Sequence, residues 1–225
     1  MGEEQGMLGR GTPSRRHVLA LLSALAAGAC ALALMEVSHS RASELEEVGQ
    51  LTRISGLVTV HRGVVLSQGA TGMRLRRGDR IATGSGGRAE MTLADGSRVT
   101  VGEESEVLVA SFLTQQRGAR AAVIELLKGI VRAVVPAGSW DRFEIRTATA
   151  IASVRSTDWL VDFDGNRTGV FVFSGGVGVT DPSGVGGVLL QPRQGSDVVR
   201  GQLPTRPVEW GQPRIDASLA RLKFD

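Results

Sequence analysis

Few side chains of this chain have the types and spacing that catalysis requires. His61 is the only histidine after residue 42, and Cys30 is the only cysteine among the 225 residues. A general acid or base needs a positioned partner within hydrogen-bond reach, and the residues near His61 supply none. The sequence also lacks a nucleophile elbow, a phosphate-binding loop and a His-Glu-x-x-His zinc motif. We therefore predict a protein that is not an enzyme and that uses no metal or cofactor.

A second group of polar residues has part of the pattern of a calcium-binding loop. It consists of Asp162, Asp164 and Asn166, with a glycine between the last two. A complete loop ends in a bidentate Glu at its twelfth position. Phe173 stands at that position here, so we predict a plain turn between two strands.

The balance of charge argues against nucleic acid as a partner. The chain has 26 Lys and Arg residues against 23 Asp and Glu residues, a formal net charge of +3. Nucleic-acid surfaces usually combine clustered basic residues with aromatic platforms, and this chain has no tyrosine. A local basic run surrounds Arg77-Gly78-Asp79. We predict a solvated, glycine-centred turn there rather than an adhesion motif or an anion-binding loop.

Residues 83–109 carry the clearest signal of secondary structure. Apolar and polar residues alternate on both sides of a turn signal, which predicts two half-buried strands. A two-residue turn would set apolar side chains opposite charged ones, because a slip of one residue inverts every side chain. A three-residue turn at 94–96 instead places Met91 opposite Val99 and puts Gly96 at the left-handed third position.

An ordered series of short motifs along residues 49–202 resembles the FecR domain. Each motif alone is unspecific, but the order in which the motifs follow one another is specific. The series includes residues 147–150. The other residues that carry the resemblance are Gly78, Asp79, Thr83, Gly84, Asp95, Gly96, Ser97, Gly129, Val154, Arg155, Ser156, Thr157 and Gly176. We interpret them as mainly structural. Ser156 stands where the family has Gly, so either the backbone stays in the β region there or this copy has diverged.

Residues 154–159, with the sequence Val-Arg-Ser-Thr-Asp-Trp, form the most prominent polar cluster. We expect Arg155 to form a buried ion pair with an Asp or Glu, which would hold neighbouring strands together. A structural role is favoured over a binding role. If the segment does bind a partner, the expected contacts are Arg155, Asp158 and Trp159.

The first 42 residues have the pattern of an export signal. Arg15 and Arg16 precede the apolar residues 18–35, and small residues around Ala42 suit cleavage before Ser43. A twin arginine ahead of a moderately apolar run resembles a Tat signal peptide. The remainder of the chain is therefore expected outside the cytoplasm, in the periplasm.

Two alternatives to a cleaved signal stay open. The apolar stretch is near the lower limit of ~17 residues that span a bilayer, so it could remain as an inner-membrane anchor. Cys30 could be the lipidation site of a lipoprotein. Apolar residues continue beyond Cys30, however, which places the cysteine inside the apolar stretch and disfavours that reading.

Beyond the leader, the sequence predicts an all-β protein. Short strands at intervals of ~8–12 residues favour stacked strands, in a sandwich or a solenoid-like fold. The expected divisions are a linker at 43–50, a β domain at 51–202 and a proline-containing tail at 203–225. Within the β domain, residues 114–121 are predicted as a polar loop, and residues 122–127 and 130–135 as two separate strands.

The tail is expected to contain one short C-terminal helix. Ile215, Leu219 and Leu222 recur at helical spacing and would share one apolar face. Asp216 is the expected cap of this helix.

The resemblance implies a role in signalling. FecR regulators are inner-membrane proteins whose cytoplasmic helical segment controls a sigma factor and whose periplasmic part senses an outer-membrane transporter. Only 17 residues precede the apolar stretch here, whereas an autonomous domain needs about 40 or more. The sigma-factor role is therefore not carried over.

We expect a non-enzymatic periplasmic module that binds another envelope protein through strand edges or loops. The alternative is a structural envelope protein that binds peptidoglycan or polysaccharide. Under both hypotheses, contact with a membrane is confined to an uncleaved N-terminal segment.

The fate of the leader can be measured directly. We predict that mass spectrometry of the protein recovered from its native host will find a mature N-terminus at Ser43, because the small residues before it suit signal peptidase. Detection of peptides from residues 18–35 in the membrane fraction would contradict cleavage and indicate a retained anchor.

Overall fold

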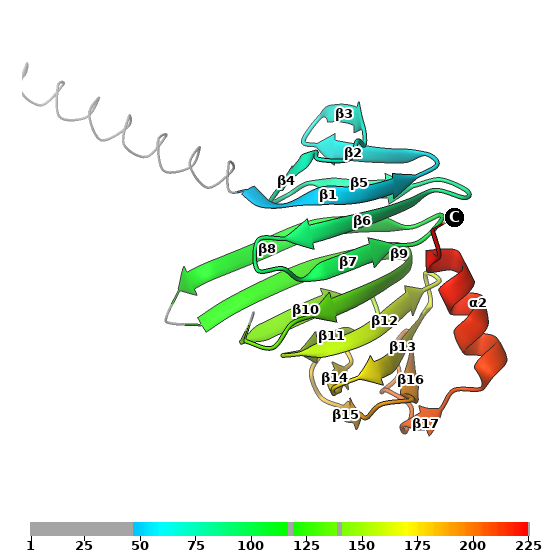
Figure 1. Ribbon diagram of the computed structural model, residues 1–225. Coiled ribbons are helices and arrows are strands. Elements are labelled where there is room, and N and C mark those ends of the chain that lie inside the picture. Colours follow the sequence, from blue (N-terminus) through cyan, green and yellow to red (C-terminus); the bar gives the residue numbers. More distant parts are fainter. Residues whose placement is uncertain (1–46, 117–118, 139–140, 225) are drawn as a thin grey trace, which may run out of the picture. The chain divides into compact units, whose positions relative to one another are not determined.

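The structure is a computed structural model that describes residues 47–116, 119–138 and 141–224 (Figure 1). The chain divides into two compact units, Met1–Glu44 and Leu45–Asp225, and the described residues belong to the second. The expected export-signal residues Arg15, Arg16 and Ala42 therefore lie outside the described residues. Within the described ranges, no helix has the length and apolar character needed to cross a bilayer.

The described chain is all-β, as predicted, with strands that pair in two layers. Layer 1 has the order β4 (Arg74–Arg76), β1 (Glu47–Ser55), β6 (Arg88–Leu93), β7 (Arg98–Val101), β9 (Ala119–Val135), β12 (Thr157–Phe163), β13 (Arg167–Ser174), β16 (Gln194–Val199) and β17 (Val208–Glu209). Layer 2 has the order β3 (Val65–Gln68), β2 (Val58–Arg62), β5 (Arg80–Thr83), β8 (Glu106–Gln116), β9, β10 (Arg142–Arg146), β11 (Ile151–Val154), β14 (Val177–Thr180) and β15 (Gly187–Leu190). The β9–β10 pair is parallel, and the other pairs are antiparallel.

The two layers enclose one apolar core. Alternate residues of each strand point inward, as the period of two along a strand requires. Met91 and Trp159 of layer 1 and Ile124 and Phe143 of layer 2 are completely buried and belong to a single cluster. The architecture therefore has the core of a sandwich, while the chain alternates between the layers as it advances, as in a solenoid (Figure 1).

Strand β9 belongs to both layers, and Gly129 is the point at which it crosses. Residues 121–125 pair with β10 in layer 2, and residues 129–135 pair with β12 in layer 1. Gly129 has a φ of +88°, a left-handed conformation that L side chains rarely adopt. A Cβ atom there would come within 2.6 Å of the Cα atom of Ser105. Glycine is therefore required twice, for its backbone angle and for the close approach.

Helix α2 (Gln212–Leu222) covers part of the outer face of layer 1 (Figure 1). Its buried side chains Ile215 and Leu222 form a second apolar cluster with strand residues that include Leu160 and Phe171. Asp162 of β12 forms an ion pair with Arg221, 2.9 Å between Oδ1 and Nη1. Ion pairs and apolar burial together hold the helix on the sheet.

Neighbouring side chains also hold the ends of α2. Asp197 of β16 forms an ion pair with Arg214, 2.6 Å between Oδ1 and Nη2. At the other end, Arg88 donates hydrogen bonds to the carbonyl oxygens of Ala220 and Arg221, which satisfies acceptors that a helix terminus leaves free.

Three of the expected boundaries are wrong. Residues 47–50, assigned to the linker 43–50, form the start of β1 and pair with β4 and β6. Residues 114–116 and 119–121 of the expected polar loop are strand, and the two strands expected at 122–127 and 130–135 are one continuous strand, β9. Polar composition predicted a loop there, but pairing between the long strands β8 and β9 overrides that local preference.

The expected cap of the C-terminal helix is also wrong. Asp216 lies inside α2, and the N-cap is Gly211. Pro213 stands in the first turn, where its fixed φ angle favours helix initiation and its missing N–H group costs nothing.

The hairpin between β6 and β7 has the predicted three-residue turn. Met91 pairs with Val99, and Ala89 pairs with Val101. Gly96 has a φ of +85° and donates its N–H group to the carbonyl of Leu93. The three-residue turn and the pairing of Met91 with Val99 that the sequence predicts are therefore confirmed.

The requirement for glycine at the crossing of β9 can be tested with a matched pair of variants. Gly129→Ala should lower the free energy of unfolding by about 3–5 kcal/mol, from left-handed strain plus collision with the Ser105 backbone. Gly96→Ala has a similar φ but no atom within 4 Å of its Cβ position, so it should cost only about 1–2 kcal/mol. Equal losses in urea unfolding would contradict the role of close approach.

Candidate interaction face

Most residues that carry the sequence resemblance lie where the chain passes between the layers. Gly78 and Asp79 precede β5, Thr83 and Gly84 end β5, Gly129 divides β9, residues 154–157 join β11 to β12, and Gly176 precedes β14. Asp95, Gly96 and Ser97 are the exception, because they form the β6–β7 turn. In that turn the Asp95 carboxylate accepts hydrogen bonds from the backbone N–H and the hydroxyl of Ser97. The pattern that sequence analysis recognised is thus mainly a pattern of layer crossings.

Asp79 forms a buried ion pair at the β4–β5 crossing. Its side chain is fully buried, and its carboxylate accepts hydrogen bonds from Nε and Nη2 of Arg62 at 2.8 and 2.7 Å. The N–H group of Arg76 donates to the same carboxylate at 2.8 Å. The hydrogen bond with Asp79 raises the pKa of Arg62, against the opposing effect of desolvation. This contact ties β2 of layer 2 to the turn after β4 of layer 1.

Hydroxyl groups hold the β7–β8 crossing against β5 and β9. The Thr83 hydroxyl donates to the carbonyl of Gly102 at 2.6 Å and accepts the N–H of Ser105 at 2.9 Å. The Ser105 hydroxyl in turn accepts the N–H of Ile130 at 2.9 Å. Buried polar groups of the crossing therefore have partners, as a low-dielectric interior requires.

A cluster of threonines holds the turn between β10 and β11. The hydroxyl oxygens of Thr147 and Thr149 each lie 2.6 Å from that of Thr168 in β13. The Thr147 hydroxyl also accepts the N–H of Ala150 at 2.9 Å. Residues 147–150 of the family series thus attach layer 2 to layer 1.

The crossing at residues 154–157 rests against the crossing that follows β13. Val154 is buried in the core, and the Thr157 hydroxyl donates to the carbonyl of Gly176 at 3.1 Å. Gly175 has a φ of +85°, and a Cβ there would come within 2.5 Å of the Ser156 carbonyl oxygen. Ser156 does not have a positive φ. Its backbone conformation therefore accommodates a serine at the position where the family has glycine.

The expected roles of Arg155 and Trp159 need correction. Arg155 is exposed and has no ion-pair partner among the described residues, so the predicted buried ion pair does not form there. Trp159 is completely buried in the core and cannot contact a partner. Asp158 pairs instead with Arg132 on the outer face of layer 1, at 2.8 and 2.7 Å, and this hydrogen bonding raises the pKa of Arg132.

Sequence analysis missed a second buried carboxylate, Glu144 of β10. Its side chain is only 3% exposed and bonds Arg142 at 2.9 Å and Arg146 at 2.6 Å. The Ser153 hydroxyl donates to it at 3.3 Å. Two guanidinium groups against one carboxylate leave one positive charge. The spacing Arg-x-Glu-x-Arg was a usable signal, because a period of two puts all three side chains on one face of a strand.

The outer faces of the two layers differ in what covers them. Part of the outer face of layer 1 lies beneath α2. The outer face of layer 2 at β9, β10, β11 and β14, which we call the open face, carries no helix in the described part of the chain (Figure 1). Two hollows of about 430 and 290 Å³ open on this face around β10, and a third of about 470 Å³ opens beside the end of β10, between the layers.

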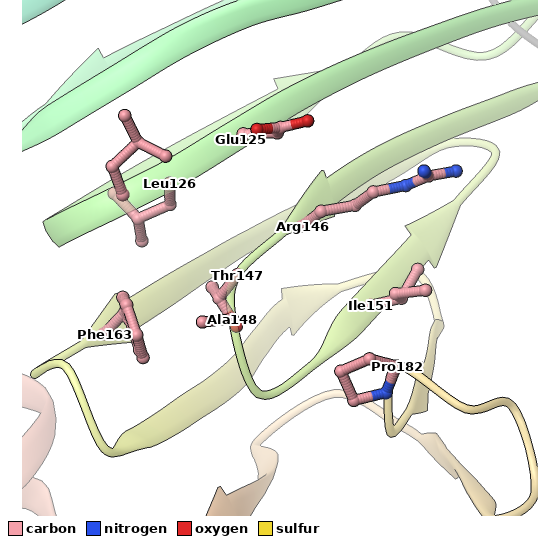
Figure 2. A pocket seen from close by; sticks show the side chains of 9 residues that line it. Glu125, Leu126, Arg146, Thr147, Ala148, Ile151, Phe163 and Pro182 are labelled. Carbon is pink, nitrogen blue, oxygen red and sulfur yellow. The ribbon is translucent and has the colours of Figure 1, made fainter. Parts of the chain in front are cut away.

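The hollow of about 470 Å³ lies where the two layers separate. β10 ends at Arg146 while β9 continues toward its crossing, and the space between them is lined by Leu126, Leu127 and Phe163. Figure 2 shows Glu125 and Arg146 extending to the right, away from Leu126 and Phe163 at the left. The hollow is thus apolar on one side and charged on the other, which suits binding rather than chemistry.

The remaining candidate residues are not assembled into a site. His61 is half-exposed in β2, opposite Leu66 and Arg80. Asp164 forms the predicted turn. Its carboxylate accepts hydrogen bonds from the N–H groups of Asn166 and Arg167, and these bonds lower its pKa. Among the described residues, no three His, Cys, Asp or Glu side chains are grouped so that they could hold a metal ion.

The sequence matches the model of one known protein family. Residues 79–178 match the model of the FecR protein family, the same family that the motif series resembles. A search of curated proteins found no match.

Solved structures show the same fold. The chain is similar to two crystal structures of a candidate anti-sigma factor from Parabacteroides distasonis ATCC 8503, with 20% sequence identity and TM-scores of 0.52 and 0.51. Each match covers 62% of this chain, and they cover 63% and 64% of the other chains. The chain thus spans a little under two thirds of those structures, and at this identity the likeness concerns the fold.

The buried ion pair at the β4–β5 crossing should contribute measurably to stability. We expect Asp79→Asn to lower the free energy of unfolding by about 2 kcal/mol, less than a fully buried pair would lose, because Arg62 is partly exposed. Glu106→Gln removes the partner of Arg80 in an exposed pair and should cost at most about 0.5 kcal/mol. A similar small loss for both variants would show that Asp79 is not a structural anchor.

Proposed function

We propose that this protein is a non-enzymatic binding module in bacterial envelope signalling, and that it binds another envelope protein from the periplasmic side of the inner membrane. The match of residues 79–178 to the FecR family supports a regulatory role. The similar crystal structures, described as a candidate anti-sigma factor, support the same class of function. The leader pattern at residues 1–42 supports export.

One observation carries the proposal: the open face has hollows and an exposed pair of arginines but no assembled catalytic group. Arg142 and Arg146 are 62% and 42% exposed, yet the buried Glu144 fixes the position of both. Fixed, exposed guanidinium groups are well suited to recognising a protein surface, since little side-chain freedom remains to be lost on binding.

The competing function is a structural envelope protein that binds peptidoglycan or polysaccharide. It uses the same exposed face but a different class of partner. The two functions differ in what becomes attached to the protein in the cell, and one cross-linking experiment separates them.

We expect a photo-cross-linking residue placed at Ser153, on the open face, to yield a covalent adduct with an envelope protein in living cells. The same residue placed at Arg98, exposed on the outer face of layer 1, is the matched control and should yield none. Immunoblotting and mass spectrometry of the adducts provide the measurement. Retention of the protein on purified cell wall, with no protein adduct from position 153, would contradict the proposal and support the structural alternative.

A further inference from the structure

Small side chains from adjacent strands line up across the open face. Ser153 of β11 lies opposite Gly178 of β14, and Gly178 lies opposite Leu189 of β15. On the other side, Ser153 lies opposite Glu144 of β10. Residues paired directly across strands share a face of the sheet. The surface therefore dips along this row, forming a trough that runs across the strands and ends at Leu189.

The floor of the trough is open. A Cβ atom added to Gly178 would find only the Ser153 carbonyl oxygen within 4 Å, at 3.8 Å, and Gly178 does not have a positive φ. The neighbouring Gly176 is similarly uncrowded, with its nearest atom at 3.7 Å. These residues line the hollow of about 430 Å³. The absence of side chains, rather than a gap in the backbone, creates the space.

The trough is lined by two arginines that differ in their partners. Arg142 and Arg155 line it together with Asp141, and Arg142 is already paired with Glu144 at the β10 end of the row. Arg155 is exposed and has no ion-pair partner among the described residues. Its planar guanidinium group offers donors that match a carboxylate in a bidentate geometry. Leu189 is 62% exposed and adds an apolar end to the trough.

We propose that this trough binds an extended acidic segment of a partner protein. One carboxylate of the segment pairs with Arg155, and an apolar side chain packs against Leu189. The inference rests on the proposed function and adds the chemistry of the partner to it. Charge complementarity favours an acidic partner, because Arg155 is exposed and forms no ion pair within the described part of the chain.

The dimensions of the trough suit such a segment. A row across β10, β11, β14 and β15 spans three gaps between strands, which amounts to roughly 14 Å. An extended peptide rises about 3.4 Å per residue, so about four residues fill the row. Alternate side chains of an extended peptide point to the same side, which lets one acidic and one apolar side chain face the sheet together.

The test uses the full chain and labelled, capped octapeptides. In fluorescence anisotropy, a peptide of alternating Glu and Leu should bind, and its counterpart of alternating Lys and Leu should not. Arg155→Glu should weaken binding of the acidic peptide by about tenfold or more, since a charge-assisted pair becomes a repulsion. Gly178→Val should fill the trough and abolish binding, while its melting temperature stays close to that of the unmodified protein.

Matched controls separate the trough from general surface effects. Arg98→Glu reverses an exposed charge on the opposite layer and should leave binding within about twofold, as expected for a charge screened by distance. Leu189→Ser should weaken binding, whereas Leu66→Ser should not. Leu66 is 60% exposed on β3, the edge strand at the other side of layer 2.

Several results would overturn the inference. They are equal binding of the acidic and basic peptides, binding that survives both Arg155→Glu and Gly178→Val, no binding at all, or binding of peptidoglycan fragments in place of the peptide. If the peptides fail while position 153 still cross-links to an envelope protein, the acidic segment is wrong and the binding function stands. If the peptides bind while no envelope protein cross-links, the proposed function fails and the trough remains.

Discussion

The structure depends on a single strand that belongs to both layers. β9 pairs with β8 and β10 on one side of Gly129 and with β7 and β12 on the other. Its crossing requires a left-handed backbone and a contact with Ser105 that leaves no room for a Cβ atom. Because β9 lies in the middle of each layer, an error in its path would displace strands on both sides. The core closes only when this crossing is made.

The same constraint explains the FecR motif series. Passing from one layer to the other breaks the strand ladders, so backbone and side-chain polar groups at each crossing need new partners. Asp79, Thr83 and Thr157 supply them as side chains, while Gly129 and Gly175 permit the close approaches. None of these contacts forms a catalytic site. The family resemblance therefore identifies how the chain is folded.

The two outer faces differ in what covers them. Layer 1 buries Leu160 and Phe171 beneath α2, and ion pairs from Asp162 and Asp197 hold the helix in place. The open face of layer 2 presents positioned guanidinium groups, short side chains and hollows without a covering helix, whereas the hollow of about 430 Å³ on layer 1 lies beside α2 and is lined by Leu219 and Leu222 of the helix. A surface that combines fixed charge with uncovered concavity costs little to organise when a partner binds.

The sequence by itself determined the all-β class and the register of the β6–β7 hairpin, because period-two patterning and turn chemistry are local. It did not determine which side chains meet. Arg155 was expected to be buried and paired and is exposed, while Trp159 was a candidate contact and lies in the core. Inward and outward positions in a two-layer fold depend on how each crossing resets the register. Ion pairs such as Arg62–Asp79 join a strand of one layer to a turn at a crossing. Only the tertiary structure determined which of these side chains are buried and which form ion pairs. Both follow from the stacking of the layers and not from neighbours in the chain.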